Sequence, residues 1–563
     1  MQGKRYRFSE KPYDVLIVGG GIYGAWIAWD AALRGLSVAL IEKEDFGHAT
    51  SSNTLRILHG GLRYLQHGDI RRVRRSIHER MVLMGLAPHL VRPLPFLIPS
   101  YGCGLRSRWA LGLAARAHAL IGLGLKPDRL GEPGKALPAA RLISREECRR
   151  LVPGIPEREL TGGIVYYEAQ MPNPERLLLS LVISAVRKGA DAANYLEVVK
   201  FLRKQKCVVG VTARDVLTGE QVDVQGRVVV NATGPWIERL LGRVNGDRRR
   251  AGPSFSKAFN LLITRRLLPD TAVGLYSRRQ FRDPDSLVET GVRLLCIVPC
   301  HGWSLVGTAH LPYGADPDSL EVTAEEVRAF LQEINAAYPG WDLTDGEVRA
   351  VHGGLVPVAG SGSRGVHLLK HHQILDHRAE EGLDGLISAI GVKYTEARAV
   401  AEMVVDLVFR KLGKVPPRST TVDTPLHGGF LGRLEDFVAR VTRNPSRGLS
   451  AAAIQHLIDQ YGSAYAEILD YLADEGESGQ PGMSNLRILK AQVRYGIREE
   501  MAQRLSDVVF RRTALGTAGN PEDDELLACA DTMAEELAWT QERKREELEA
   551  VMSVSSWSAQ GRS

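Results

Sequence analysis

The sequence has few cysteines and little excess charge of either sign. Six cysteines are scattered over 563 residues without a CxxC pair, which excludes a disulfide framework and favours a reducing cytoplasm. Cys296 and Cys300 are close together, but their segment fits a buried strand, where free cysteines pack as small hydrophobic side chains. The net charge is only +6, and no aromatic side chains interleave with the arginines of 71–75 for base stacking. We therefore predict no metal site and no nucleic-acid partner.

Long apolar runs are also missing. Val15–Trp29 lacks charge but is short and rich in glycine, and Leu294–Ala315 is broken by Pro299 and Gly302. A membrane-spanning helix needs about 20 mostly apolar residues. The basic amino end has no apolar core behind it, so it does not resemble a secretory signal. We expect a cytoplasmic protein, with peripheral attachment to the inner face of the cytoplasmic membrane as an open alternative.

The strongest motif lies near the amino end. The apolar run Asp14–Val18 is typical of a strand buried on both faces, and it leads into glycines that fit GxGxxG at Gly19, Gly21 and Gly24. The first glycine permits a tight turn, and the second lets a pyrophosphate approach the backbone. The third lets the predicted helix Ala25–Leu33 pack closely on the strand, with its N-terminal N–H groups toward the phosphates. The pattern predicts dinucleotide binding.

Two further features bear on which dinucleotide is bound. A second predicted strand, Leu36–Ile41, ends in Glu42, where an acidic residue accepts ribose hydroxyls in both FAD and NAD sites. The run Val228–Trp236 then takes an apolar strand into Ala232-Thr233-Gly234. This is similar to the second FAD-contacting strand of flavoproteins with two dinucleotide-binding domains, although a strand end with a turn has the same form. We interpret the pair of features as an FAD site.

Longer blocks carry a closer match. Ala49-Thr50-Ser51-Ser52 precedes Leu58-His59-Gly60-Gly61-Leu62-Arg63-Tyr64-Leu65, and Gly391-Val392-Lys393-Tyr394-Thr395 follows much later. By these blocks the chain resembles the FAD-dependent glycerol-3-phosphate dehydrogenases of the D-amino-acid-oxidase-like flavoprotein superfamily, over roughly residues 13–540. The second block is the most specific part of the match. The resemblance implies an α/β fold with a discontinuous Rossmann-like FAD-binding domain, a mixed-sheet substrate domain and an all-helical C-terminal domain.

The same resemblance implies FAD as cofactor and oxidation of sn-glycerol 3-phosphate, a small phosphorylated polyol, to dihydroxyacetone phosphate, with electrons passed to a quinone. The hydroxyl side chains at 50–52 would lie near the flavin or the pyrophosphate, although they also fit a helix cap. The implied cofactor-binding residues are Gly19, Gly21, Gly24, Glu42, Thr50, Ser51, Ser52, His59, Gly60, Gly61, Leu62, Ala232, Thr233, Gly234, Gly391, Val392, Lys393, Tyr394 and Thr395.

Four residues are candidates for the catalytic chemistry. Arg63 and Lys393 match family positions that contact substrate or flavin, and an arginine is suited to hold a phosphate in two hydrogen bonds. An arginine at position 63 also fits an ordinary surface charge. His310 and His352 are candidate bases for the hydroxyl proton, because histidine titrates near neutrality. Each of them fits a buried core histidine equally well.

Three positions depart from the family pattern. Val356 stands where the family has a phosphate-binding arginine, Asn260 where it has a histidine, and His310 where it has an acid. Loss of one charge-assisted contact costs about 1.5–3 kcal/mol, which is about ten- to a hundredfold in affinity. Two alternatives stay open: oxidation of another hydroxy or amine substrate, with O2 as a further acceptor, and a flavoprotein without turnover. The cations that would compensate are Lys257, Lys370 and His371.

Composition and pattern divide the chain into parts. We expect an FAD-binding domain of 13–70, 160–240 and 350–412, an insertion of 71–159, a substrate domain of 241–349, a helical domain of 431–550 and a disordered tail of 551–563. Within the insertion, Leu105–Leu125 carries Arg106, Arg108 and Arg116, Trp109 and no acid. Such a helix is able to lie on anionic lipid; a packed helix with a solvated basic face is the alternative. The oligomeric state stays open.

Overall fold

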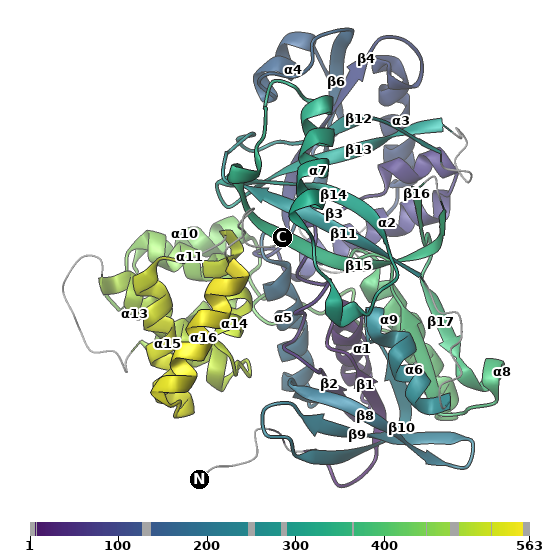
Figure 1. Ribbon diagram of the computed structural model, residues 1–563, viewed down its shortest axis with the longest axis vertical. Helices are drawn as coiled ribbons and strands as arrows, with labels where there is room; N and C mark the ends of the chain where they lie inside the picture. The colour runs from purple at the N-terminus through teal and green to yellow at the C-terminus, as the bar shows by residue number, and fades with distance from the viewer. Residues whose placement is uncertain are drawn as a thin grey trace.

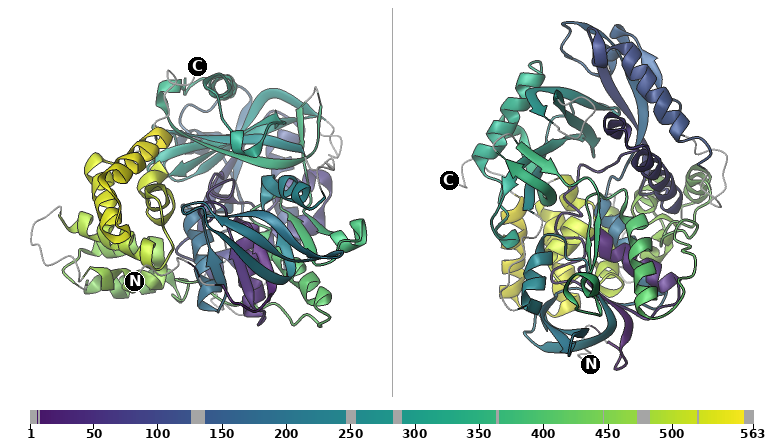
Figure 2. Two further views of the ribbon diagram at one scale, coloured as in Figure 1. Left: turned by 60° about the horizontal axis from the view of Figure 1, so that its bottom comes forward. Right: turned by 90° about the vertical axis from the view of Figure 1, so that its right-hand side faces the viewer.

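The structure is a computed structural model that describes residues 6, 8–125, 137–245, 254–282, 290–362, 365–445, 447–472, 483–518 and 521–555. Two sheets lie one above the other in Figure 1, and a group of helices from the C-terminal part of the chain flanks them on one side. In Figure 2 the same helices lie beside the sheets in the left view and behind the lower sheet in the right view. The two sheets together build the site described below.

The first sheet has a parallel centre. β1 (Tyr13–Val18) lies between β10 (Gln221–Asn231) and β2 (Val38–Ile41), and all three run parallel. β18 (Leu386–Ile390) continues the sheet beside β10, and β7 (Asp191–Ala193) continues it beside β2, again in parallel. The antiparallel additions are β8 (Leu196–Lys204), β9 (Cys207–Asp215) and β17 (Gln373–Asp376). The central strands are apolar on both faces, because helices cover one face and β8, β9 and α6 (Ile237–Asn245) cover the other.

Three helices belong to this sheet. α1 (Ile22–Leu33) packs against α5 (Pro174–Arg187) and α9 (Ala397–Lys411), which are far away in the sequence. Trp26 of α1 is fully buried in the largest hydrophobic cluster, which joins these helices to β1 and β2. The amino end of α1 is thereby fixed directly after β1, as a dinucleotide site requires. The remaining helix next to these strands is α6 (Ile237–Asn245), and the short α8 (His377–Glu381) precedes β18.

The second sheet has ten strands in the order β16-β15-β11-β14-β13-β12-β4-β6-β3, with β5 beside β6. It is mixed, because β12 pairs with β4 in parallel while its other pairings are antiparallel. α7 (Ala324–Ala337) packs on β12, and α3 (Arg108–Ile121) packs on β6. The strand bounds are β3 Ile57–Leu58, β4 Arg92–Tyr101, β5 Arg141–Ile143, β6 Leu160–Gln170, β11 Ser254–Ile263, β12 Ala272–Arg282, β13 Thr290–Cys300, β14 Trp303–Tyr313, β15 Val348–Gly362 and β16 Gly365–Leu368.

The C-terminal helices form a domain with two hydrophobic clusters of its own. It meets α5 through the ion pairs Arg176–Glu500 and Arg187–Glu467. Its helices are α10 (Leu434–Arg443), α11 (Ala451–Tyr461), α12 (Tyr465–Tyr471), α13 (Met483–Arg498), α14 (Leu505–Asp507), the turn Val508–Arg512, α15 (Asp523–Leu537) and α16 (Gln541–Ser555). Two further helices among the described residues are α2 (Ile70–Leu86) and α4 (Arg145–Leu151).

The expected fold class is confirmed, but the second sheet extends beyond the expected substrate domain of 241–349. That segment supplies β11 to β14, whereas 57–170 and 348–368 supply the other strands. Sequence pattern identifies strands but not their partners across the chain, so the pairing of β4 with β6 and of β12 with β4 was not predictable. α16 continues to Ser555, into the expected tail, and 556–563 lies outside the described residues. Among the described residues, no helix has the length and apolar character needed to cross a membrane.

Candidate functional site

A cavity of about 480 Å³ lies between the two sheets. On one side it is lined by residues at the carboxyl ends of β1, β2, β10 and β18, where ligands of open parallel sheets bind. On the other side it is lined by residues of β11, β14, β15 and β16. An elongated ligand in this space touches segments that are hundreds of residues apart in the sequence.

The glycine turn at the end of β1 leaves no room for side chains. A Cβ atom on Gly19 would lie 2.6 Å from the Ala232 carbonyl oxygen, and Gly19 has a φ of +106° that favours glycine. A Cβ atom on Gly24 would lie 1.8 Å from the Gly19 carbonyl oxygen. Gly21 lines the cavity itself. The three predicted glycines therefore serve the turn, the cavity and the close packing of α1.

Glu42 lies beside this turn. Its carboxylate accepts hydrogen bonds from the Gly20 N–H (2.6 Å) and the Glu44 N–H (3.0 Å). Burial raises the pKa of Glu42, and these two N–H donors act against that rise. The apolar side chains of Leu196 and Val198 line the same end of the cavity. This end therefore combines a carboxylate for ribose hydroxyls with an apolar surface for a base.

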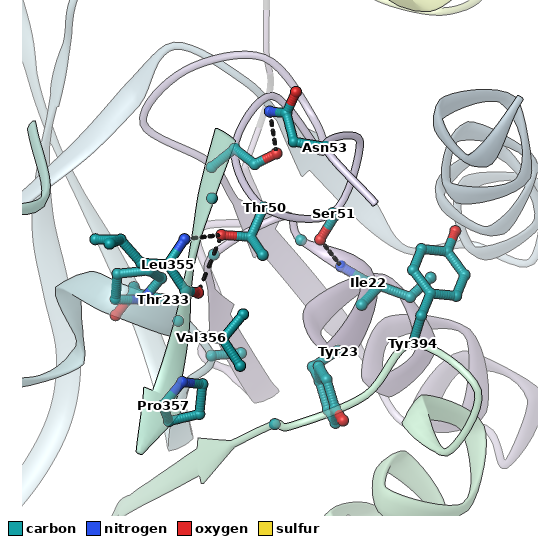
Figure 3. A pocket seen from close by; sticks show the side chains of 18 of the residues that line it. Ile22, Tyr23, Thr50, Ser51, Asn53, Thr233, Leu355, Val356, Pro357 and Tyr394 are labelled. Atoms are coloured by element: carbon teal, nitrogen blue, oxygen red, sulfur yellow. Dashed lines mark hydrogen bonds between the residues drawn. The ribbon is translucent and has the colours of Figure 1, made fainter. Parts of the chain in front are cut away.

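The predicted hydroxyl residues divide into two groups (Figure 3). Thr50 and Ser51 line the cavity. The Ser51 Oγ accepts a hydrogen bond from the Ile22 N–H (3.0 Å) at the start of α1. The Thr50 hydroxyl accepts from the Leu355 N–H (3.2 Å) and donates to the Leu355 carbonyl (3.3 Å), which ties this loop to β15. Ser52 instead donates to the Gly47 carbonyl (2.7 Å).

Tyr23 is a site residue that the sequence did not single out. Its hydroxyl donates to the Lys393 carbonyl (2.7 Å) and accepts from the N–H groups of Val392 (3.1 Å) and Lys393 (3.2 Å). A Cβ atom on Gly391 would lie 1.9 Å from the Tyr23 ring. Tyr23 thus holds the segment 391–395, all of which lines the cavity. Its only sequence signal was its place inside the glycine motif.

Lys393 is a cavity residue whose pKa lies near neutral pH. Its Nζ lies 3.6 Å from the centre of the Tyr64 ring and 3.5 Å from a Glu396 carboxylate oxygen. Burial lowers the pKa of Lys393 to about 7, and the positive charge of Arg72 adds to this, whereas Glu396 acts against it. The amine is therefore partly protonated at neutral pH.

The cavity wall formed by the second sheet carries polar and aliphatic side chains. Asn260, Thr308, His310 and Val356 line it, and the Thr308 hydroxyl donates to Asn260 Oδ1 (2.8 Å). The His310 Nδ1 lies 3.3 Å from the Ser256 hydroxyl. Adjacent strands bring these positions together, because Ala258 of β11 is paired with His310 of β14 and with Gly354 of β15.

The other predicted residues lie as follows. His352 is paired with Asn260 across β15 and β11 but is not among the described residues that line the cavity. Burial and the charge of Arg56 lower the pKa of His352 to about 3, so its ring is neutral at physiological pH. Arg63 belongs to the 3-10 helix Leu62–His67, and its side chain lies outside the described residues. Lys257 is bound to Glu326 (2.6 Å), away from Val356.

The segment His59–Gly60 is held by the buried carboxylate of Glu168, which also pairs with Arg80. His59 lines the cavity, with its Nδ1 3.9 Å from a Glu168 oxygen. The Gly60 N–H donates to the other Glu168 oxygen (2.5 Å), and Arg80 contacts that oxygen at the same distance. Gly60, Gly61 (φ +82°) and Leu62 are not among the described residues that line the cavity.

The predicted residues Ala232–Gly234 line the cavity. Next to them lies a second group of residues that sequence analysis missed. The Asp318 carboxylate accepts hydrogen bonds from Lys43 (2.6 Å), the indole N–H of Trp236 (2.8 Å) and Arg239. Burial alone would raise the pKa of Asp318, but these donors outweigh it and lower the pKa to about 2. Because the four residues come from three different parts of the chain, no local pattern identifies them.

The geometry fits FAD. The cavity extends from a carboxylate and an apolar end, past glycine N–H groups at the start of α1, to the wall formed by 391–395 and the second sheet. The residues that would hold FAD are the glycine turn, Glu42, Thr50, Ser51, Ala232–Gly234 and 391–395. Backbone amides, a carboxylate and hydroxyls are the donor set that a flavin dinucleotide requires.

Comparison with known proteins agrees with this. Residues 14–407 match the family model of FAD dependent oxidoreductases, and residues 419–544 match the C-terminal domain of alpha-glycerophosphate oxidase. The chain is 31% identical over 537 residues to a glycerol-3-phosphate dehydrogenase of Synechocystis sp., covering 94% of both chains. It is also 31% identical to one of Mycobacterium leprae, covering 95% of this chain and 87% of that one.

A solved structure extends the likeness to three dimensions. The glycerol-3-phosphate dehydrogenase of Bacillus halodurans, complexed with FAD, has a TM-score of 0.75 and 27% sequence identity, with 97% of this chain and 95% of that chain covered. The protein is thus an FAD-dependent oxidoreductase, and the expected family and cofactor are confirmed. The chain belongs to the FAD-dependent glycerol-3-phosphate dehydrogenase family.

Proposed function

We propose that this enzyme oxidises sn-glycerol 3-phosphate to dihydroxyacetone phosphate. The observation that carries the proposal is the similarity, over nearly the whole chain, to relatives that bear the name glycerol-3-phosphate dehydrogenase. It includes the FAD-binding part and the helical domain alike. Bound FAD supplies the hydride acceptor for such an oxidation.

The chain's own residues then have separate roles in our proposal. The C2–H bond of the substrate breaks as hydride is transferred, and the C2 hydroxyl gives its proton to His310, so that C2 becomes a carbonyl. Ser256, buried next to His310 Nδ1, orients the ring. Lys393, with Arg63, would attract the phosphate as cations. His352 is the weaker candidate base, because its lowered pKa disfavours accepting a proton.

Anaerobic mixing of the holoenzyme with sn-glycerol 3-phosphate tests the proposal. We expect the flavin absorbance near 450 nm to bleach at millimolar substrate, in about one equivalent per FAD, and dihydroxyacetone phosphate to appear. Absence of bleaching, with dithionite still able to reduce the same flavin, would refute this substrate. The sn-glycerol 1-phosphate enantiomer serves as the matched control.

A second candidate function is oxidation of a different hydroxy or amine substrate, with O2 as an alternative acceptor. Val356 and Asn260 favour it, because both line the substrate side of the cavity where the family has charged or titratable groups. A panel of unphosphorylated polyols, hydroxy acids and amines in the same bleaching assay separates the two candidates. A flavoprotein without turnover would be reduced by none of them.

For the second half-reaction we propose a quinone as acceptor, reached at a membrane surface. α3 presents Trp109 (80% exposed), Leu113 (68%) and Leu120 (65%) along one side, at helical spacing with Arg116. Its other side docks on the protein, where His118 Nε2 lies 2.9 Å from the Gly60 carbonyl oxygen, next to the cavity residue His59. An anionic lipid surface complements the apolar stripe and its arginines.

A further inference from the structure

Eight residues of the loop 42–53, which follows β2, line the FAD cavity, including Glu42, His48, Thr50 and Ser51. Asp45 lies in the middle of this loop but is not among the described lining residues. Its side chain has no solvent exposure and faces the helical C-terminal domain. One side of the loop therefore lines the cavity that would hold FAD, and the other side contacts the helical domain.

Two consecutive arginines of the helical domain grip Asp45. Arg512 contacts both carboxylate oxygens, at 2.5 Å and 2.8 Å, and Arg511 binds one of them through its Nε. Asn194 completes the shell with a hydrogen bond of 2.9 Å. Burial alone would raise the pKa of Asp45, but the two guanidinium groups outweigh it and hold that pKa well below its usual range. The carboxylate is thus charged and fully paired.

Arg511 and Arg512 are themselves fixed by further contacts within the helical domain. Arg511 pairs with Asp507 (2.6 Å), which also accepts from the Tyr195 hydroxyl (2.6 Å). Arg512 donates to the Glu500 carbonyl oxygen (2.7 Å). Planar guanidinium groups fixed in this way define the direction of a carboxylate, because two parallel hydrogen bonds set both position and angle.

The neighbours of Asp45 transmit that position to the glycine turn. Phe46 is buried against Gly20, where a Cβ atom would lie 2.6 Å from the Phe46 ring. The Gly47 N–H donates to the Gly20 carbonyl (3.1 Å), while the Gly20 N–H binds Glu42. The loop and the phosphate-binding turn are therefore one hydrogen-bonded unit, with Asp45 as its point of attachment to the helical domain.

We propose that the helical domain positions the cofactor site through Arg511 and Arg512, which fix loop 42–53 in its FAD-binding conformation by holding Asp45. Asp45, Arg511 and Arg512 are positioning residues in this view, because they act through the loop. The proposal does not depend on the identity of the substrate. It gives the C-terminal domain a part in retaining FAD.

The test is the rate of FAD release from purified holoenzyme variants, followed as a rise of flavin fluorescence after dilution, with melting temperature measured in parallel. Arg512→Gln should release FAD at least tenfold faster than the wild type, and Arg512→Lys, which keeps the charge, should lie between them. The control is Arg187→Gln, which breaks another ion pair of the same domain interface, Arg187–Glu467, without removing a contact of Asp45 or Arg512.

The control separates positioning from general destabilisation. Arg187→Gln should lower the melting temperature yet release FAD within twofold of the wild-type rate. In Asp45→Asn/Arg512→Gln neither partner is left as an isolated buried charge, so this variant should fold if the single variant does not, and it should still release FAD quickly. Release at the wild-type rate by the double variant, or equal acceleration in Arg187→Gln and Arg512→Gln, would overturn the proposal.

Discussion

At the scale of single residues, the cavity combines a glycine turn and a carboxylate suited to FAD with uncharged side chains such as Asn260 and Val356 on the wall formed by the second sheet. The glycine turn and Glu42 have the steric and electrostatic setting that a dinucleotide needs. Val356, by contrast, puts an aliphatic side chain into the cavity next to Pro357 (Figure 3). Lys257, one of the cations expected to compensate for Val356, is paired with Glu326. In our proposal, substrate preference depends on a few side chains of β11, β14 and β15 that line the cavity.

Restoring the charge at position 356 should strengthen binding of a phosphorylated substrate. Val356→Arg adds one charge-assisted contact worth about 1.5–3 kcal/mol, so KM for sn-glycerol 3-phosphate should fall by about ten- to a hundredfold. Val356→Met, which adds length without charge, is the matched control and should not lower KM. Steady-state kinetics of both variants measure this, and an unchanged KM in Val356→Arg would mean that Val356 does not limit phosphate binding.

The lowered pKa of Lys393, about 7, predicts a pH dependence. Below pH 7 the amine is protonated and attracts the phosphate; as pH rises from 7 to 9 that charge is lost, so KM should increase. Lys393→Arg stays charged over this range and should show a nearly flat KM. Lys393→Gln should show a high KM at every pH. The same inflection in wild type and Lys393→Arg would assign it to another group.

At the scale of elements, α3 differs from the other helices in the side that it exposes. Ser107 caps its amino end, and Ala115 and His118 face the protein. Its opposite side exposes the apolar side chains of Trp109, Leu113 and Leu120 together with the positive charge of Arg116, and exposed apolar side chains of this kind often mark an interaction surface. The amphipathic pattern was evident in the sequence. Which side of the helix faces solvent was not, because both sides contain leucine and alanine.

Sedimentation with lipid vesicles tests the proposed role of α3. Wild-type protein should bind vesicles of phosphatidylglycerol more strongly than vesicles of phosphatidylcholine, and Trp109→Ser/Leu113→Ser/Leu120→Ser should lose at least tenfold in partitioning, since each apolar side chain contributes to insertion. The control variant Val415→Ser/Phe430→Ser removes other exposed apolar residues (90% and 66% exposed). Equal losses in both variants would argue against a specific surface.

At the scale of the whole molecule, the cavity has walls from both sheets, so FAD should tie the two halves together. The helical domain adds buried ion pairs to α5 and to loop 42–53. Stabilisation by a ligand of the folded state grows with its concentration relative to Kd. This links cofactor content to the stability of the entire chain.

Removal of FAD should therefore lower the melting temperature. At a free FAD concentration a hundred times Kd, the holoenzyme should be more stable than the apoenzyme by about 2.7 kcal/mol. Differential scanning fluorimetry with an extrinsic dye, with FAD added back to the apoprotein, measures the difference. AMP, which lacks the flavin, is the control and should restore much less; an apoprotein that melts at the same temperature as the holoenzyme would contradict this.

The sequence by itself determined the FAD turn, because the positive φ of Gly19 and the close approach of Gly24 to the Gly19 carbonyl arise within six consecutive residues and leave a local pattern. It also determined the family, through blocks such as His59–Leu65. Only the tertiary structure decided which strands share the second sheet, that Tyr23 holds 391–395, and that Arg512 reaches Asp45. Those contacts join residues far apart in the chain, and their energies depend on burial and geometry, which the spacing of residues along a sequence does not contain.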